Sequence, residues 1–139
     1  MLRIDLERKT VAASVLALLA PPEDVPRPAG VLADARTLIG AEVHRAWRAE
    51  MERLPGFEAE VTLSWEGEVA GFAVSLRGRA DGVLAGPDGT RTVAEVKTVD
   101  LAAEDLAALS WEGLPDAATQ ARLYALCVAA TLPPPSGLP

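Results

Sequence analysis

The hydrophobic pattern of the chain changes period at Gly56, and this change limits the folds that the chain can adopt. Before Gly56, apolar residues recur at helical spacing over about residues 31–54, and Pro55 ends the run. After Gly56, apolar and polar residues alternate, which is the period of a half-buried strand. The apolar members of this alternation are Ala59, Val61, Leu63 and Trp65. A long helix followed by strands predicts a domain that mixes both kinds of element.

The remaining elements are expected from the same periodicity and from turn residues. In chain order they are a helix over residues 7–20, a strand over 72–77, a strand over about 91–99, a short helix over about 104–109 and a last helix over about 117–131. The run Gly86-Pro87-Asp88-Gly89 predicts a turn between the last two strands, and Asp116 is expected to cap the last helix. The expected fold class is therefore α/β, of the mixed α+β kind, with a small mixed sheet of about three strands flanked by helices.

The chain of 139 residues is expected to form a single domain. Its parts would be an N-terminal helix over residues 7–20, a core over 31–131 and a proline-rich tail over 132–139. The buried face of the long helix is expected to consist of apolar residues at helical spacing: Leu32, Leu38 or Ile39, Val43, Trp47, Met51 and Leu54. Glutamates are interleaved with Arg45, Arg48 and Arg53 on this helix, which favours a solvated charged face over a phosphate-binding one.

Charge and cysteine content exclude several classes of protein. The formal net charge is −7, which disfavours binding of nucleic acid over a broad surface but allows a metal site built from carboxylates. Cys127 is the single cysteine, so the chain contains no disulfide framework, no four-cysteine zinc site and no cysteine-ligated iron–sulfur cluster. The neighbours of Cys127 in the sequence are apolar, so we expect this residue in the core.

No run of about 18 apolar residues occurs, so no segment is expected to span a membrane, and we expect the protein in the cytoplasm. Residues 11–20 form an apolar run after basic residues, as in a signal peptide. However, Asp5 and Glu7 lie in the region that would have to be positive. An amphipathic first helix is therefore the favoured interpretation of this segment.

Three charged residues on the last two strands point to divalent-metal chemistry. Glu95 and Lys97 are two positions apart in a strand, so their side chains project from one face. Pairing through the preceding turn would bring Asp81 near Glu95, so that carboxylates and an ammonium group converge. Carboxylates suit Mg²⁺ or Mn²⁺, and an adjacent lysine can orient a metal-bound water. The alternative is that Asp81 occupies a turn while Glu95 and Lys97 form a solvated surface pair.

These residues belong to a larger pattern that continues on the helices before and after the strands. The pattern consists of His44, Asp81, Glu95, Val96, Lys97, Gln120 and Tyr124. It covers about residues 36–128 and resembles the PD-(D/E)XK nuclease superfamily, in particular its RecB-like branch. The opening segment and residues 78–83 also resemble the nuclease-like N-terminal domain of some DinG-like helicases. The resemblance implies a restriction-endonuclease-like core.

The resemblance also implies a role for each residue of the pattern. The divalent metal would be held by the side chains of His44, Asp81 and Glu95 and by the backbone carbonyl of Val96. Lys97 would orient the attacking water, and Gln120 and Tyr124 would support the site and contact the cleaved strand. Taken alone, His44 fits a core or surface position, and Gln120 and Tyr124 fit an ordinary pair on one helix face.

Two departures from the family affect these expectations. The members that bind an iron–sulfur cluster need a set of cysteines, which this chain lacks, so no cluster is expected. The family has a further strand after the helix that carries Gln120. A proline-rich tail follows that helix here, so this final strand is expected to be missing.

The sequence therefore predicts a DNA nuclease domain that hydrolyses phosphodiester bonds with Mg²⁺ or Mn²⁺ and acts with a helicase domain or subunit. Because of its negative charge and the missing strand, the isolated chain is expected to cut DNA weakly or not at all. One alternative is a non-catalytic docking or DNA-guiding module of a helicase. Another is a generic α/β domain in which the motif is coincidental.

Overall fold

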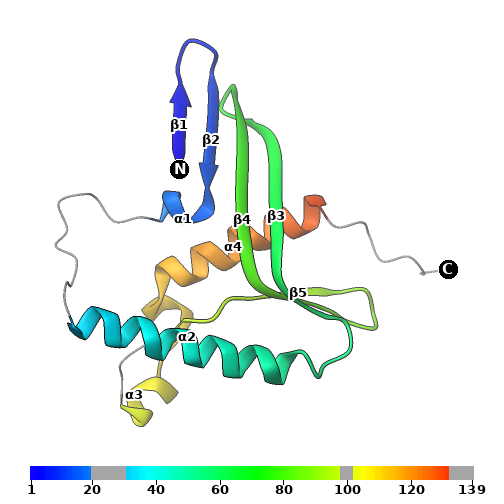
Figure 1. Cartoon of the computed structure of the whole chain (residues 1–139). Helices are drawn as coiled ribbons and strands as arrows, with labels where there is room; N and C mark the ends of the chain where they lie inside the picture. The colour runs from blue at the N-terminus through cyan, green and yellow to red at the C-terminus, as the bar shows by residue number, and fades with distance from the viewer. Residues whose placement is uncertain (20–30, 98–101, 132–139) are drawn as a thin grey trace.

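A mixed, open sheet of five strands forms the frame of the structure (Figure 1). The computed structural model describes residues 1–19, 31–97 and 102–131. The strands are β1 (Leu2–Asp5), β2 (Thr10–Ser14), β3 (Phe57–Val69), β4 (Phe72–Ala85) and β5 (Arg91–Ala94). The helices are α1 (Val15–Leu18), α2 (Val31–Met51), α3 (Ala103–Ala107), the short 3₁₀ helix η1 (Trp111–Gly113) and α4 (Pro115–Thr131). The protein is thus a mixed α/β protein, as the sequence predicts.

Strand β4 is the centre of the sheet. Along one edge it pairs antiparallel with β3 over almost its whole length. On the other edge, β2 pairs in parallel with residues 73–77, and β5 pairs antiparallel with residues 82–85. β1 extends the sheet beyond β2. Within the part of the chain that the structure describes, residues 78–81 of β4 therefore have no strand partner on this second edge.

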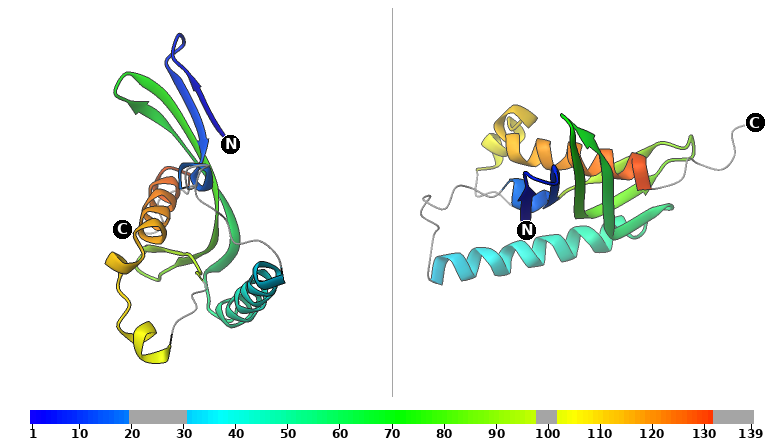
Figure 2. Two further views of the ribbon diagram at one scale, coloured as in Figure 1. Left: turned by 90° about the vertical axis from the view of Figure 1, so that its left-hand side faces the viewer. Right: turned by 90° about the horizontal axis from the view of Figure 1, so that it is seen from above.

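Helices α4 and α2 lie on opposite sides of the β3–β4 hairpin (Figure 2). The core lies on the α4 side, where Tyr124, Cys127 and Val128 of this helix are buried against the sheet. The buried residues that meet them are Ala13, Val15, Leu63, Leu76, Ala80 and Val83. Cys127 is fully buried, as the sequence predicts, and this burial raises the pKa of its thiol.

Near Glu60, the side chains of the β3–β4 hairpin change the side of the sheet to which they point. Gly78 and Gly82 are four positions apart in β4, so they would face the same side of a regular strand. Instead, a Cβ atom on Gly78 would run into the ring of Tyr124 in α4, whereas one on Gly82 would lie 3.3 Å from the ring of Trp47 in α2. On β3, opposite the stretch between the two glycines, Glu60 has a φ of 52°. Because the backbone is irregular here, the side of the hairpin that faces α4 at Gly78 faces α2 at Gly82.

Helix α2 contacts the sheet through a narrow stripe. Over residues 38–51, its half-buried residues are Gly40, His44, Trp47 and Met51, which follow helical spacing. The rings of Trp47 and Phe57 are 5.7 Å apart with an interplanar angle of 83°, a favourable edge-to-face arrangement. The stripe therefore places His44 on the side of α2 that faces the sheet.

The buried face that the sequence predicts for α2 is largely wrong. Trp47 and Met51 are half-buried as expected, but Leu38, Ile39 and Val43 are exposed. Leu54, beyond the end of the helix, is exposed as well, and the side chain of Leu32 lies outside the described residues. Hydropathy selected the apolar side of the helix, whereas the observed contact is centred on His44 and Trp47. Despite these exposed apolar residues, neither α2 nor any other helix of the described residues is long and apolar enough to cross a membrane.

The prediction of a helix over residues 7–20 is also wrong. This segment contains strand β2 and then only the four-residue helix α1, and residues 2–5 form strand β1. Val11, Ala13 and Val15 are spaced by two positions, so the same residues suit a strand as well as a helix. Pairing of β2 with β4 decides between the two and leaves Ala13 and Val15 buried. The sheet accordingly has five strands rather than about three.

Other boundaries differ from the expected ones by a few residues. β4 continues to Ala85, well beyond the expected strand over 72–77. α4 begins at Pro115, so Asp116 lies in its first turn rather than before it. Residues 98 and 99 of the expected third strand lie outside the described residues. So does the tail over 132–139, on which the expectation of a missing final strand rests.

We expect Gly78→Ala to lower the free energy of unfolding by about 1–3 kcal/mol, the usual cost of overpacking a core. The reason is that the added methyl group would run into the ring of Tyr124. Urea unfolding followed by circular dichroism measures the change. In a Tyr124→Ala background, where the ring is absent, the same substitution should cost clearly less. An equal cost in both backgrounds would contradict the close packing described here.

Candidate metal centre

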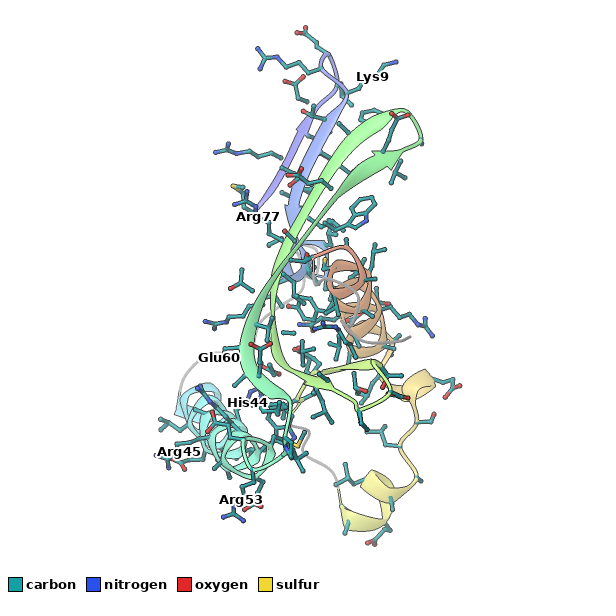
Figure 3. All side chains as sticks on the ribbon, turned by 90° about the vertical axis from the view of Figure 1, so that its right-hand side faces the viewer. Lys9, His44, Arg45, Arg53, Glu60 and Arg77 are labelled. Carbon is teal, nitrogen blue, oxygen red and sulfur yellow. The ribbon has the colours of Figure 1, made fainter. Side chains whose placement is uncertain are left out.

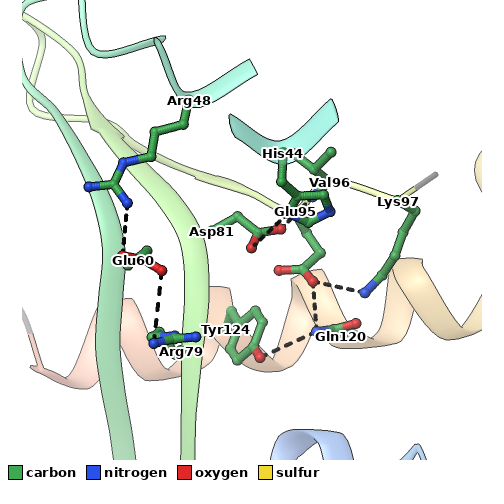
Figure 4. A network of polar contacts seen from close by, with 10 residues as sticks. All are labelled: His44, Arg48, Glu60, Arg79, Asp81, Glu95, Val96, Lys97, Gln120 and Tyr124. Atoms are coloured by element: carbon green, nitrogen blue, oxygen red, sulfur yellow. Dashed lines mark hydrogen bonds and ion pairs between the residues drawn. The ribbon is translucent and has the colours of Figure 1, made fainter. Parts of the chain in front are cut away.

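Asp81 joins three parts of the chain (Figure 4). It lies in the stretch of β4 between the segments paired with β2 and β5, and its side chain is 27% exposed. Its Oδ2 accepts a hydrogen bond of 2.8 Å from the backbone N–H of Val96, just after β5. Its Oδ1 lies 3.7 Å from Nδ1 of His44 on α2. Asp81 is thus part of an ordered site, and the alternative that it merely occupies a turn is excluded.

Glu95 carries the most deeply buried carboxylate of the site. Its side chain is only 9% exposed. Oε1 accepts hydrogen bonds from Nζ of Lys97 at 2.9 Å and from Nε2 of Gln120 at 2.8 Å. Oε2 is buried and has no hydrogen-bond partner within the described structure. A buried carboxylate oxygen without a partner is unfavourable, because its hydration is lost without replacement.

Gln120 and Tyr124 hold Glu95 from the side of α4. Both residues are buried, and they are one helical turn apart. The Nε2 group of Gln120 donates to Glu95 and also lies 3.3 Å from the hydroxyl oxygen of Tyr124. Because Gln120 is packed into the core side of the sheet, it fixes the position of Glu95 rather than contacting solvent. The structure thus brings these two sequence-predicted residues to the site in a supporting position.

His44 completes the set from the opposite side. It lies on the stripe of α2 that faces the sheet, and its side chain is 40% exposed. Its distance of 3.7 Å to Asp81 is too long for a hydrogen bond but places an imidazole nitrogen beside the carboxylate. All seven residues that the sequence predicts for the site therefore lie in one neighbourhood, contributed by α2, β4, the segment after β5, and α4 (Figure 4).

The hydrogen bonds leave one oxygen of each carboxylate available. Oδ2 of Asp81 is taken by Val96, and Oε1 of Glu95 is taken by Lys97 and Gln120. Oδ1 of Asp81 faces His44, and Oε2 of Glu95 is buried without a partner. Carboxylate oxygens and an imidazole nitrogen are suitable donors for Mg²⁺ or Mn²⁺, and the unpartnered oxygen is a position where a cation would be favourable. Among the described residues, no group of three or more His, Cys, Asp or Glu side chains is already arranged as a metal site.

Two features near the site were not predicted from the sequence. One is the N–H of Val96, which orients Asp81, whereas the sequence pattern assigned this residue only a carbonyl ligand. The other is an ion-pair network in which Glu60 of β3 lies between Arg48 of α2 and Arg79 of β4. Glu60 is one of several polar residues in an alternating strand, so nothing in the sequence distinguishes it.

Arg45 of α2 and Arg53, two residues beyond the end of this helix, lie on a solvated charged face, as the sequence predicts. Arg45 pairs with Glu42, and Arg53 pairs with Glu50 at 3.1 Å. Arg53 points away from the sheet (Figure 3), whereas Arg45 also lines a pocket with His44 and Asp81. Arg48 differs from them because it reaches β3, and its hydrogen bond to Glu52 raises the pKa of its guanidinium.

Comparison with known proteins adds little to this geometry. No protein-family model matches the chain, and no curated protein matches it. Among solved structures, the crystal structure of SSO0001 is similar with a TM-score of 0.40 and 25% sequence identity. The similarity covers 47% of this chain and 30% of that chain.

We expect Mn²⁺ to raise the melting temperature of the protein, because a cation would compensate the free oxygens of Asp81 and Glu95. At a metal concentration a hundred times the dissociation constant, the stabilisation is about 2.7 kcal/mol. Asp81→Asn should abolish most of this shift. Glu68→Gln, which makes the same charge change at an exposed position of β3, is the matched control and should keep it. Equal shifts in both variants would contradict the proposed ligands.

Proposed function

We propose that this protein is a nuclease domain that hydrolyses phosphodiester bonds of DNA with Mg²⁺ or Mn²⁺. The observation that carries the proposal is the arrangement of Asp81, Glu95 and Lys97. Each carboxylate has one oxygen fixed by hydrogen bonds and one left over, and an ammonium group lies 2.9 Å from Glu95. Anionic ligands for a metal ion and a nearby cationic group are a combination that can hydrolyse a phosphodiester.

The order of the elements supports a more specific proposal. The site residues come from α2, β4, the segment just after β5, and α4 in this order, with Asp81 on β4, Glu95 directly after β5 and the glutamine on the following helix. This order agrees with a restriction-endonuclease-like core and with the PD-(D/E)XK superfamily that the sequence pattern resembles. We therefore propose that the chain is a member of the RecB-like branch of this superfamily.

In the proposed site, His44, Asp81 and Glu95 would hold the metal ion, together with the carbonyl of Val96. The bound metal would supply Lewis acidity and lower the pKa of a coordinated water. Gln120 occupies Oε1 of Glu95, so that Oε2 is the oxygen presented to the cation.

Lys97 contributes the positive charge that the chain itself brings to the chemistry. Its ammonium group is held by Glu95 yet remains 39% exposed, so it can reach a substrate. There it would orient the attacking water and offset the negative charge that grows on the phosphoryl oxygens.

We also propose that a partner delivers the DNA, in keeping with the resemblance to nuclease-like domains of helicases. The net charge of −7 supports this proposal, because a broad electrostatic attraction for DNA is absent. The corresponding location would be the cytoplasm.

Lys97→Ala tests the chemistry separately from metal binding. Cleavage of DNA should fall by about 10²–10⁴-fold, whereas the metal-induced rise in melting temperature should persist. Lys97→Arg should restore only part of the activity, since a planar guanidinium does not reproduce a compact ammonium group. Lys9→Ala, which removes the other lysine of the chain, is the control and should cut DNA normally.

The outcomes of this assay also separate the alternatives. Cleavage that does not depend on Lys97 would refute the proposed role of this residue. Metal binding without any cleavage, even with a helicase present, would favour a non-catalytic docking or DNA-guiding module.

A further inference from the structure

The face of the sheet that carries Asp81 also carries a second charged arrangement. Glu60 lies opposite Asp81 in the β3–β4 register, between the pairs Ala59↔Gly82 and Val61↔Ala80. One oxygen of Glu60 accepts a hydrogen bond of 2.9 Å from Nη1 of Arg48, and the other lies 3.9 Å from Nη1 of Arg79. Two guanidinium groups thus face the two oxygens of one carboxylate, directly beside the candidate metal centre (Figure 4).

This arrangement opens into a pocket that continues to the metal centre. The pocket has a volume of about 190 Å³ and is lined by His44, Arg45, Trp47, Arg48, Glu60 and Asp81. The side chains of Arg48 and Glu60 are 45% and 51% exposed, so an anion from solution can reach them. The pocket therefore connects Arg48 and Glu60 to two of the candidate metal ligands, His44 and Asp81.

We propose that Arg48 and Arg79 bind a backbone phosphate of a nucleic-acid strand next to the metal centre, and that Glu60 holds their place when no strand is bound. The inference rests on the proposed function, and it names the part of the substrate that lies beside the cleaved bond. Two non-bridging phosphate oxygens present the same acceptor pattern as the two carboxylate oxygens of Glu60.

The ion pairs with Glu60 are suited to exchange. They are exposed, and exposed ion pairs contribute little to stability, so replacing Glu60 with a phosphate costs little. Arg48 also donates through Nε to Glu52 at 2.7 Å. This bond keeps the guanidinium oriented while Nη1 changes its partner.

The backbone of Glu60 also positions its side chain. Its φ of 52° is unfavourable for a residue with a side chain, and such strained residues cluster at functional sites. The strained backbone lies where the hairpin exchanges its faces, which brings Glu60 between the two arginines on the side of α2.

Binding of fluorescein-labelled single strands tests the proposal. Anisotropy titrations with DNA and with RNA of the same sequence are made in the Lys97→Ala background with Mn²⁺, so that the strand is not cut. Glu60→Gln should tighten binding about tenfold, because it releases both arginines. Arg48→Gln and Arg79→Gln should each weaken binding about tenfold, and each should lower the salt dependence by about 0.7 in log–log slope, as expected for one lost phosphate contact on a single strand.

Matched controls remove the effect of net charge. Glu50→Gln and Arg53→Gln make the same charge changes on an exposed ion pair at the end of α2, where Arg53 points away from the sheet. They should alter binding by less than about twofold, because they leave the phosphate contacts in place. If Glu60→Gln and Glu50→Gln tighten binding equally, the proposal is overturned. Because Arg79 lies on β4 and Arg48 on α2, the arginine test does not depend on one variant that fails to fold.

The remaining outcomes distinguish this inference from the proposed function. Cleavage by the unaltered protein together with unchanged binding by the arginine variants would overturn the phosphate site and leave the nuclease standing. The expected binding changes without any cleavage, even with a helicase present, would support the phosphate site and overturn the nuclease. An effect on DNA alone or RNA alone would overturn a phosphate contact in favour of recognition of the sugar. No binding of either nucleic acid would overturn the phosphate site and leave the nuclease to be tested with the helicase that delivers the strand.

Discussion

The position of the candidate site depends on how the edge of β4 is shared. β3 occupies one edge of this strand, while β2 and β5 take separate segments of the other and leave residues 78–81 between them without a strand partner in the described structure. Asp81 lies in this interval, where the backbone after β5 can turn in and donate its N–H to the carboxylate. A continuous neighbouring strand would have used this edge for ladder hydrogen bonds and closed the space. The position of the site is therefore set by the pairing of the strands, and the side chains occupy the space that this pairing leaves.

Burial of the Glu95 carboxylate lowers the stability of the fold and favours binding of a cation. Lys97 and Gln120 satisfy one oxygen of the carboxylate, and the other is enclosed without a partner. The fold tolerates this because Gln120 is anchored in α4, next to the tightly packed contact between Tyr124 and Gly78. A rigid core that holds one unsatisfied group in place is typical of sites where stability is given up for binding.

Contacts that depend on one element were predicted better than the framework. The two-residue spacing of Glu95 and Lys97 and the single helical turn between Gln120 and Tyr124 each require only one element to form, and both contacts are present. The segment over residues 7–20 and the buried side of α2 were predicted wrongly, because long-range pairing with β4 and contact with Trp47 decide them. The positive φ of Glu60 has no local signal at all. It follows from two helices packing on opposite sides of one hairpin.

The narrow attachment of α2 has a thermodynamic consequence. His44 and Arg48 are one turn apart on this helix, so its contact with the sheet places an imidazole beside Asp81 and a guanidinium beside Glu60 at the same time. In the proposed site, occupancy by the cation and by the phosphate would each stabilise the same seated position of the helix. Reciprocity then requires that each ligand increases the affinity for the other by the same factor. A weakly attached helix would in this way make metal and substrate bind cooperatively. Each ligand alone would bind weakly, and the two together would bind more tightly.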